Sequence, residues 1–189
     1  MAWREALHGL PVRAALRYEK HWRRVILAWK EHGYFRLAAP LGELLQPIIS
    51  DIAGAKDVAL VPVPSSLRGW LTRGVEPTVL LARSAAKHGP ELAWSVQRLL
   101  ARARVVQSPQ KTRRRRDRMR TPRQFRPRGV VPACPVVIVD DVVTTGHTLE
   151  SAARVLTGAG CQVIGAAVLA ATPGVTGANN QDYAEGTSR

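Results

Sequence analysis

The chain has 189 residues, 46% of them hydrophobic, and a net charge of +14 at pH 7, which fits one globular domain with a sizeable core. No apolar run approaches the roughly 20 residues that span a bilayer, and the N-terminus lacks the apolar core of a signal peptide, so we expect a cytoplasmic protein. Cys134 and Cys161 are too few for a disulfide framework and too sparse for a zinc site.

Two amphipathic helices are expected first, and they define a helical N-terminal extension over residues 1–54. Each has an apolar stripe at helical spacing and ends near a glycine, Gly33 or Gly54. We expect these stripes to pack against a sheet or to shape one side of a site. The stripes consist of Tyr18, Trp22, Val25, Ile26 and Trp29, and of Leu37, Leu41, Leu44, Leu45, Ile48 and Ile52.

Residues 57–64 predict a short buried strand ending in Val-Pro-Val-Pro, followed by a polar loop over residues 65–74. A helix is expected to begin near Glu76-Pro77, because proline is favoured at the first helical position. Arginine in such a loop suits phosphate binding, since its planar guanidinium holds two oxygens and stays charged. A solvated loop without a role stays open as the alternative. The candidate residues are Ser65, Ser66, Arg68 and Arg73.

Most of the excess charge lies between residues 98 and 128, where thirteen Lys or Arg residues face the single acid Asp117. Blocks of like charge repel one another, so we expect the centre of this segment to be mobile while no anion is bound. An active-site lid, a contact to nucleic-acid phosphates and a solvated run all stay open, and the scarcity of aromatic residues gives base stacking little support. The centre is the run Arg113, Arg114, Arg115 and Arg116.

The most specific pattern in the chain lies at residues 136–148. Four β-branched residues, Val136 to Val139, predict a strand covered on both faces, as in a parallel sheet. Asp140 and Asp141 follow at its carboxyl end, the edge where open α/β sheets bind ligands. An ordinary strand–helix unit is one alternative; a nucleotide hydrolase would need a G-x-x-x-x-G-K-[ST] loop, which the chain lacks.

A polar turn follows the two acids and opens a helix, whose apolar face is Leu149, Ala152, Ala153 and Leu156. Unpaired N–H groups and the positive end of the helix dipole make such a turn an anion site. The acids would repel a phosphate, so we expect them to accept hydrogen bonds from sugar hydroxyls or to hold a hydrated Mg²⁺. The pattern therefore indicates a phosphorylated sugar. The turn consists of Thr144, Thr145, Gly146, His147 and Thr148.

Together these patterns predict an α/β fold, in which a mostly parallel sheet is flanked by helices on both faces. The main domain is expected over residues 55–172, after the helical N-terminal extension. Residues 173–189, rich in Gly, Asn, Thr and Ala, are expected to be a disordered tail. The predicted strands are Val58–Val63, a weaker one at Ser95–Leu100, Val136–Asp140 and Val163–Ala170.

Residues 136–148 resemble the phosphoribosyl pyrophosphate (PRPP) motif of the type I phosphoribosyltransferases. The chain also resembles the ComF family, a phosphoribosyltransferase-like group whose best-known members are linked to DNA uptake. Many ComF relatives carry an N-terminal cysteine-rich zinc module that is not seen here, and the Leu and Asn of their basic loop are not in register. The segments that carry the resemblance are the Val-Pro-Val-Pro strand with its Arg-Gly loop, Leu16-Arg17-Tyr18-Glu19, Trp29-Lys30-Glu31-His32-Gly33, Gln110 and Phe125.

The resemblance implies displacement of pyrophosphate from PRPP by a nitrogen nucleophile, with Mg²⁺ as the cofactor. It makes Asp140 and Asp141 the catalytic pair, which contacts the ribose hydroxyls and Mg²⁺, if necessary through water. The turn 144–148 would hold the 5′-phosphate, and Ser65, Ser66, Arg68 and Arg73 the pyrophosphate. Two alternatives stay open: a PRPP-sensing regulator, and a competence accessory protein that binds single-stranded DNA through its Arg-rich segment. A homodimer is also left open.

Overall fold

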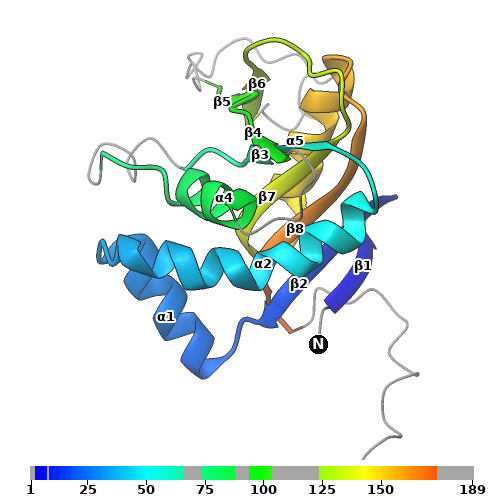
Figure 1. Cartoon of the computed structure of the whole chain (residues 1–189). Helices are drawn as coiled ribbons and strands as arrows, with labels where there is room; N and C mark the ends of the chain where they lie inside the picture. Colours follow the sequence, from blue (N-terminus) through cyan, green and yellow to red (C-terminus); the bar gives the residue numbers. More distant parts are fainter. Residues whose placement is uncertain (1–2, 8, 66–73, 88–93, 104–123, 174–189) are drawn as a thin grey trace, which may run out of the picture.

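The computed structural model describes residues 3–7, 9–65, 74–87, 94–103 and 124–173. Within these ranges, helices connect strands of one central sheet (Figure 1). None of the helices in the described ranges has the length and hydrophobicity that crossing a bilayer requires. The elements are β1 (Trp3–Leu7), β2 (Leu10–Arg17), α1 (Lys20–Glu31), the 3-10 helix η1 (Phe35–Leu37), α2 (Ala38–Ala53), β3 (Val58–Pro62), α4 (Pro77–Lys87), β4 (Trp94–Val96), β5 (Leu100–Arg102), β6 (Phe125–Pro127), β7 (Val136–Val143), α5 (His147–Gly158) and β8 (Val163–Ala171).

The central sheet has six strands in the order β1-β2-β8-β7-β3-β4. Strands β2, β8, β7, β3 and β4 run parallel to one another, whereas the edge strand β1 runs antiparallel to β2. Strands β5 and β6 form a separate antiparallel pair. The predicted α/β fold with a mostly parallel sheet is therefore confirmed.

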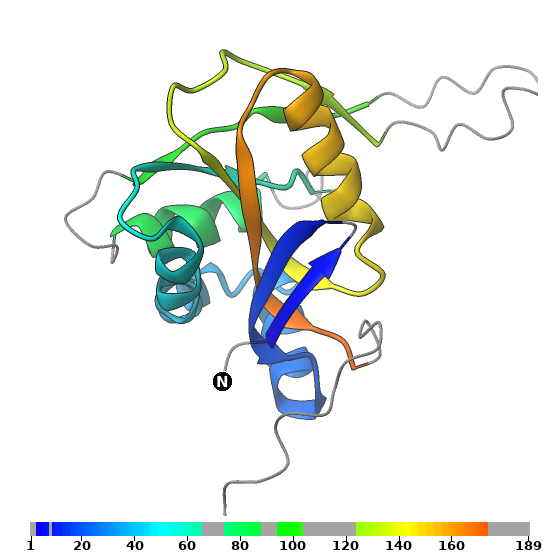
Figure 2. The ribbon, with the colours of Figure 1, turned by 90° about the vertical axis from the view of Figure 1, so that its right-hand side faces the viewer.

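Helices cover both faces of the sheet, as parallel strands require. Val136 and Ile138 of β7 belong to a core shared with α5, whereas Val137 and Val139 belong to a second core shared with α1, α2 and α4. Figure 2 shows α5 on one side of the central strands and α2 with α4 on the other. Successive residues of β7 thus face opposite sides of the sheet, which is the ordinary geometry of a strand.

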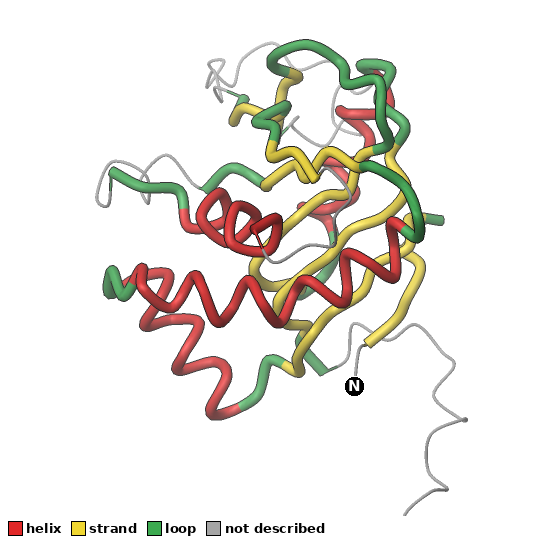
Figure 3. Tube along the Cα trace, in the orientation of Figure 1, coloured by secondary structure: helices red, strands yellow, loops and turns green. Residues whose placement is uncertain are grey.

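The N-terminus differs from the prediction, because residues 3–7 and 10–17 form two strands before the first helix (Figure 3). Strand β2 lies inside the sheet, parallel to β8, and its Val12 and Ala14 are completely buried. The expectation that only helices precede the strand at Val58 is therefore wrong for residues 3–17. The segment is rich in alanine and arginine, which favour helices, and its pairing with β8 overrides that preference.

The two predicted helices of the N-terminal segment are confirmed as α1 and α2, which end just before Gly33 and Gly54, both with positive φ. The helix expected at Glu76-Pro77 is also confirmed, as α4. The division of the chain at residues 54 and 172 stays a prediction. The tail expected from residue 173 lies, from residue 174 on, outside the described residues.

The predicted strands at Val58–Val63 and Val163–Ala170 differ from β3 and β8 by one residue at the end, and the other two differ more. The strand expected at Ser95–Leu100 is divided between β4, which pairs with β3, and β5, which pairs with β6. Strand β7 does not stop at Asp140 but continues to Val143, because it stays paired with β8 up to Ala171. Both aspartates therefore lie within the strand, and the turn begins after Val143.

Helices α2 and α4 approach each other closely at Gly42. A Cβ atom added to Gly42 would lie 2.5 Å from the Cβ of Ser84 and 2.8 Å from the backbone nitrogen of Ala85. These distances are shorter than van der Waals contact, and one of the atoms belongs to rigid backbone. A glycine is therefore required at position 42, where α2 packs against α4.

Gly42→Ala should lower the free energy of unfolding by about 1–3 kcal/mol, the usual cost of overpacking a well-packed core. Chemical denaturation measures this change. The matched control is Gly158→Ala, because a Cβ atom at Gly158, the last residue of α5, meets nothing within 4 Å. Equal stability of the two alanine variants would show that α2 and α4 can separate at little cost.

Candidate functional site

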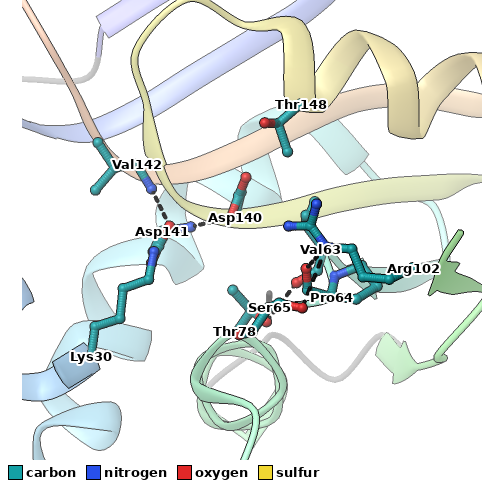
Figure 4. A pocket seen from close by; sticks show the side chains of 10 residues that line it. All are labelled: Lys30, Val63, Pro64, Ser65, Thr78, Arg102, Asp140, Asp141, Val142 and Thr148. Carbon is teal, nitrogen blue, oxygen red and sulfur yellow. Dashed lines mark hydrogen bonds and ion pairs between the residues drawn. The ribbon is translucent and has the colours of Figure 1, made fainter. Parts of the chain in front are cut away.

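A cavity of about 230 Å³ opens at the carboxyl ends of β3 and β7. This is the edge at which parallel α/β sheets bind ligands. Side chains from both faces of the sheet reach it, and Figure 4 shows them converging around the two aspartates. The lining consists of Lys30, Val63, Pro64, Ser65, Thr78, Arg102, Asp140, Asp141, Val142 and Thr148.

The two carboxylates of the cavity are buried, with 7% of Asp140 and 4% of Asp141 exposed. Each is held by the backbone: the Asp141 N–H donates to Asp140 Oδ1 at 2.9 Å, and the Val142 N–H donates to Asp141 Oδ1 at 2.8 Å. Because they are neighbours on a strand, their side chains start on opposite faces of the sheet. One oxygen of each carboxylate is thereby fixed, while the other is left for a different partner.

Two cations interact with the carboxylate pair. Lys30, near the end of α1, forms an ion pair with Asp141 Oδ2. Arg102, at the end of β5, interacts electrostatically with Asp140. The two cations come from elements on opposite faces of the sheet, which matches the opposite directions of the two acids.

Burial raises the pKa of Asp140 well above its ordinary value, and the neighbouring Asp141 raises it further. The hydrogen bond from the Asp141 backbone and the charge of Lys30 act in the opposite direction but are smaller. Burial also lowers the pKa of Arg102, and Asp140 opposes that shift. Asp140 is therefore a carboxylate whose negative charge the surrounding residues compensate only in part.

Arg102 joins three parts of the site. Its Nε donates to the carbonyl oxygens of Pro64 at 3.1 Å and Ser65 at 3.3 Å, in the segment that follows β3. Its guanidinium lies 4.8 Å from the ring centre of Phe125 on β6, within the range of a cation–π contact. The start of the loop after β3 is thus fixed relative to the β5–β6 pair and Asp140. Thr78 of α4 holds the same segment, since its hydroxyl donates to the Val63 carbonyl at 2.8 Å.

The predicted anion-binding turn leads from β7 into α5, as expected. Gly146 precedes the helix with φ of 78°, a conformation that favours glycine. The first hydrogen bond of α5 runs from the Glu150 N–H to the Gly146 carbonyl at 3.0 Å. The N–H groups of the first turn before Glu150 have no intrahelical acceptor, so they can donate to an anion.

The structure brings four of the predicted site residues together in the cavity wall: Asp140, Asp141, Ser65 and Thr148. Thr144, Thr145, Gly146 and His147 lie in the adjoining turn, where His147 Nδ1 is 2.9 Å from the Thr145 hydroxyl. Their role in phosphate binding stays a prediction. Outside the described residues lie Ser66, Arg68, Arg73, Gln110, Arg113, Arg114, Arg115 and Arg116.

Lys30, Thr78 and Arg102 line the cavity but were not predicted as site residues. The pattern around Trp29-Lys30 was noted only as a family resemblance, and Arg102 was one of thirteen basic residues in its segment. Thr78 directly follows the proline that starts α4, a place where a threonine has no special meaning. Only the contacts across the fold distinguish these residues from their neighbours in sequence.

The carboxylate oxygens of the site fit the needs of a magnesium ion that binds together with a phosphorylated ligand. In the part of the chain that the structure describes, no cluster of three or more His, Cys, Asp or Glu side chains could hold a metal alone. Mg²⁺ usually keeps several waters and uses one or two carboxylates together with substrate phosphates. Asp140 and Asp141 supply that number of carboxylates at the cavity.

Known proteins show the following similarities. The family described as "Phosphoribosyl transferase domain" matches residues 36–189. A crystal structure of a hypoxanthine phosphoribosyltransferase from Staphylococcus aureus has 11% identity and a TM-score of 0.43, covering 78% of this chain and 70% of that chain. One of a phosphoribosyltransferase from Corynebacterium diphtheriae has 16% identity and a TM-score of 0.38, covering 80% and 90%. No curated protein matches the chain.

Asp140→Asn should stabilise the protein. The raised pKa of Asp140 means that its native-state contribution is most favourable below the unfolded pKa of about 4 and is lost as pH rises toward the folded pKa. The variant should therefore melt roughly 2–4 °C higher at neutral pH, as about 1 kcal/mol gives for a chain of this size, and the difference should shrink toward pH 4.

Thermal unfolding at several pH values measures this effect. The control is Asp57→Asn, because Asp57 is exposed and lies just before β3. A variant at Asp140 that melts below the wild type at every pH would show that the partners of Asp140 more than compensate its burial.

Proposed function

The chain belongs to the phosphoribosyl transferase domain family, and from this we propose that it transfers the phosphoribosyl group of PRPP to a nitrogen acceptor. The observation that carries the proposal is the buried pair Asp140–Asp141, which lines a cavity at the carboxyl end of β7 and is followed by the glycine turn into α5. Carboxylates that only accept hydrogen bonds suit sugar hydroxyls, and a helix N-terminus suits a phosphate.

PRPP would lie across the ends of β3 and β7. We assign the ribose hydroxyls to Asp140 and Asp141, and the 5′-phosphate to the N–H groups and hydroxyls of residues 144–148. The pyrophosphate is assigned to the segment that begins at Ser65 and continues through Ser66, Arg68 and Arg73. This order is supported by the positions of Ser65 and Thr148, which lie in the wall of the cavity that the two acids also line.

In the proposed reaction the bond between C1 of the ribose and the pyrophosphate oxygen breaks, and its electron pair leaves with pyrophosphate. The acceptor nitrogen forms the new bond to C1 and releases its proton to solvent. Positive charge develops on the sugar in the transition state, and the two buried carboxylates would face it. Mg²⁺ bound with PRPP would supply positive charge next to the departing pyrophosphate.

We further propose that the protein is of the ComF type. Two residues named in that resemblance support this proposal. Lys30 forms the ion pair with Asp141, and the ring of Phe125 forms a cation–π contact with the guanidinium of Arg102. A PRPP sensor without turnover, or a protein that binds single-stranded DNA through residues 113–116, would keep the same PRPP site. Turnover of PRPP with an acceptor would identify an enzyme and exclude the sensor. Salt-dependent binding of DNA would identify the DNA-binding protein.

Asp141→Asn should weaken binding of PRPP with Mg²⁺ by about tenfold or more, because loss of a charged hydrogen-bond partner costs about 1.5–3 kcal/mol. Isothermal titration calorimetry at moderate salt measures the change. Asp57→Asn, on the exposed residue before β3, is the control and should bind PRPP as the wild type does. If the wild type binds no PRPP, the proposed function is wrong.

Gly146→Ala should weaken binding of ribose 5-phosphate, a probe that lacks the pyrophosphate, by about fivefold or more. Alanine at a φ of 78° is strained by about 1–2 kcal/mol, and relief of that strain would move the N–H groups away from the phosphate. The matched control is Gly160→Ala at the other end of α5, where φ is 96° and a Cβ meets nothing within 4 Å. Equal loss of binding in both variants would contradict the phosphate assignment.

A further inference from the structure

The ion pair between Lys30 and Asp141 joins the N-terminal helix α1 to the functional edge of the sheet (Figure 4). The two partners have different environments, since 35% of the Lys30 side chain is exposed but only 5% of the Asp141 side chain. The carboxylate is thus fixed inside the protein, while the lysine reaches it from the surface.

The contacts of Asp141 show what Lys30 occupies. Asp141 Oδ1 is held by the Val142 N–H, whereas Oδ2 is buried and accepts no hydrogen bond from the residues that the structure describes. Its partner is the Lys30 ammonium. A carboxylate oxygen has two lone pairs, so Oδ2 is the atom to which a ribose hydroxyl or a metal-bound water would donate.

The backbone of α1 is anchored independently of this pair. Trp29 and Ile26 are buried in the core beneath the helix, with 0% and 1% exposed. The lysine ammonium is carried on a flexible four-carbon stem, and 35% of the side chain is exposed. The ammonium can therefore leave Asp141 while the helix stays in place.

We propose that Lys30 is a displaceable counter-ion of the site. In the empty protein its ammonium neutralises Asp141, and it moves away when the ribose hydroxyls or the Mg²⁺ of a PRPP complex reach that carboxylate. The Lys30 ammonium occupies Asp141 Oδ2, so free Mg²⁺ must compete with it for that carboxylate. This inference rests on the proposed function for its ligand, but its effect on free Mg²⁺ does not.

The first test is titration of MgCl₂ alone, without PRPP, into the wild type and Lys30→Met. Removal of the ammonium should raise the affinity for Mg²⁺ about tenfold or more, because a buried carboxylate loses its compensating charge. Asp141→Asn added to Lys30→Met should remove the gain. The control is Lys20→Met, the same change at an exposed lysine in the first turn of α1. Unchanged Mg²⁺ affinity in Lys30→Met would overturn the proposal.

Lys30→Arg provides a second test that does not remove the charge and is therefore expected to fold. A guanidinium binds a carboxylate through two hydrogen bonds and is harder to displace, so PRPP should associate about fivefold more slowly while the Tm is maintained or raised. If Lys30 only stabilises the fold, PRPP should associate with Lys30→Arg as fast as with the wild type. That result would contradict the proposal. Stopped-flow fluorescence of the buried tryptophans can follow association.

The outcomes separate this inference from the proposed function. A wild type that binds no PRPP refutes the function, yet the MgCl₂ titration still decides whether Lys30 holds metal off the acids. If Lys30→Met does not fold, the arginine variant decides: slower association supports displacement, and an unchanged rate overturns it.

Discussion

The structure depends on the burial of two adjacent carboxylates at the end of one parallel strand. Neighbouring residues of a strand point to opposite faces, so the charge of Lys30, which pairs with Asp141, offsets only a part of the burial of Asp140. Charge must be supplied twice, and the chain does so with Lys30 from one face and Arg102 from the other. An uncompensated buried charge is costly, so α1 on one face and β5 on the other are both held at the carboxyl end of β7.

The compensation is unequal, and this bears on function. Asp141 has a direct ion pair, whereas Asp140 has its pKa raised by burial and by its neighbour. The guanidinium of Arg102 is turned toward the carbonyls of Pro64 and Ser65 as well as toward Asp140. A site that holds negative charge in excess suits a ligand that brings hydrogen-bond donors or a cation, and the burial of that charge lowers the stability of the fold.

The sequence was informative where chemistry is local. The run Val136–Val139, the two acids and Gly146 identify a strand, a polar edge and a helix start within one short segment, and the structure has all three. It was uninformative where a partner lies far along the chain. Lys30 precedes Asp141 by more than a hundred residues, and the family resemblance around Trp29-Lys30 gave it no role in the site. Residues 10–17 resemble a helix by composition and become a strand because β8 offers them a paired edge.

The position of β2 shows that the region of family similarity and the central sheet have different N-terminal limits. Similarity to the family begins at residue 36, but the hydrogen-bonded sheet also includes β2 and the edge strand β1. The residue after β2 is attached as well, since the Tyr18 N–H donates to the Ala171 carbonyl at 2.7 Å. A fragment trimmed to the recognisable region would retain both aspartates, lose the lysine that faces one of them, and expose β8 as an open edge prone to aggregation. The region of family similarity is thus smaller than the region that forms the sheet.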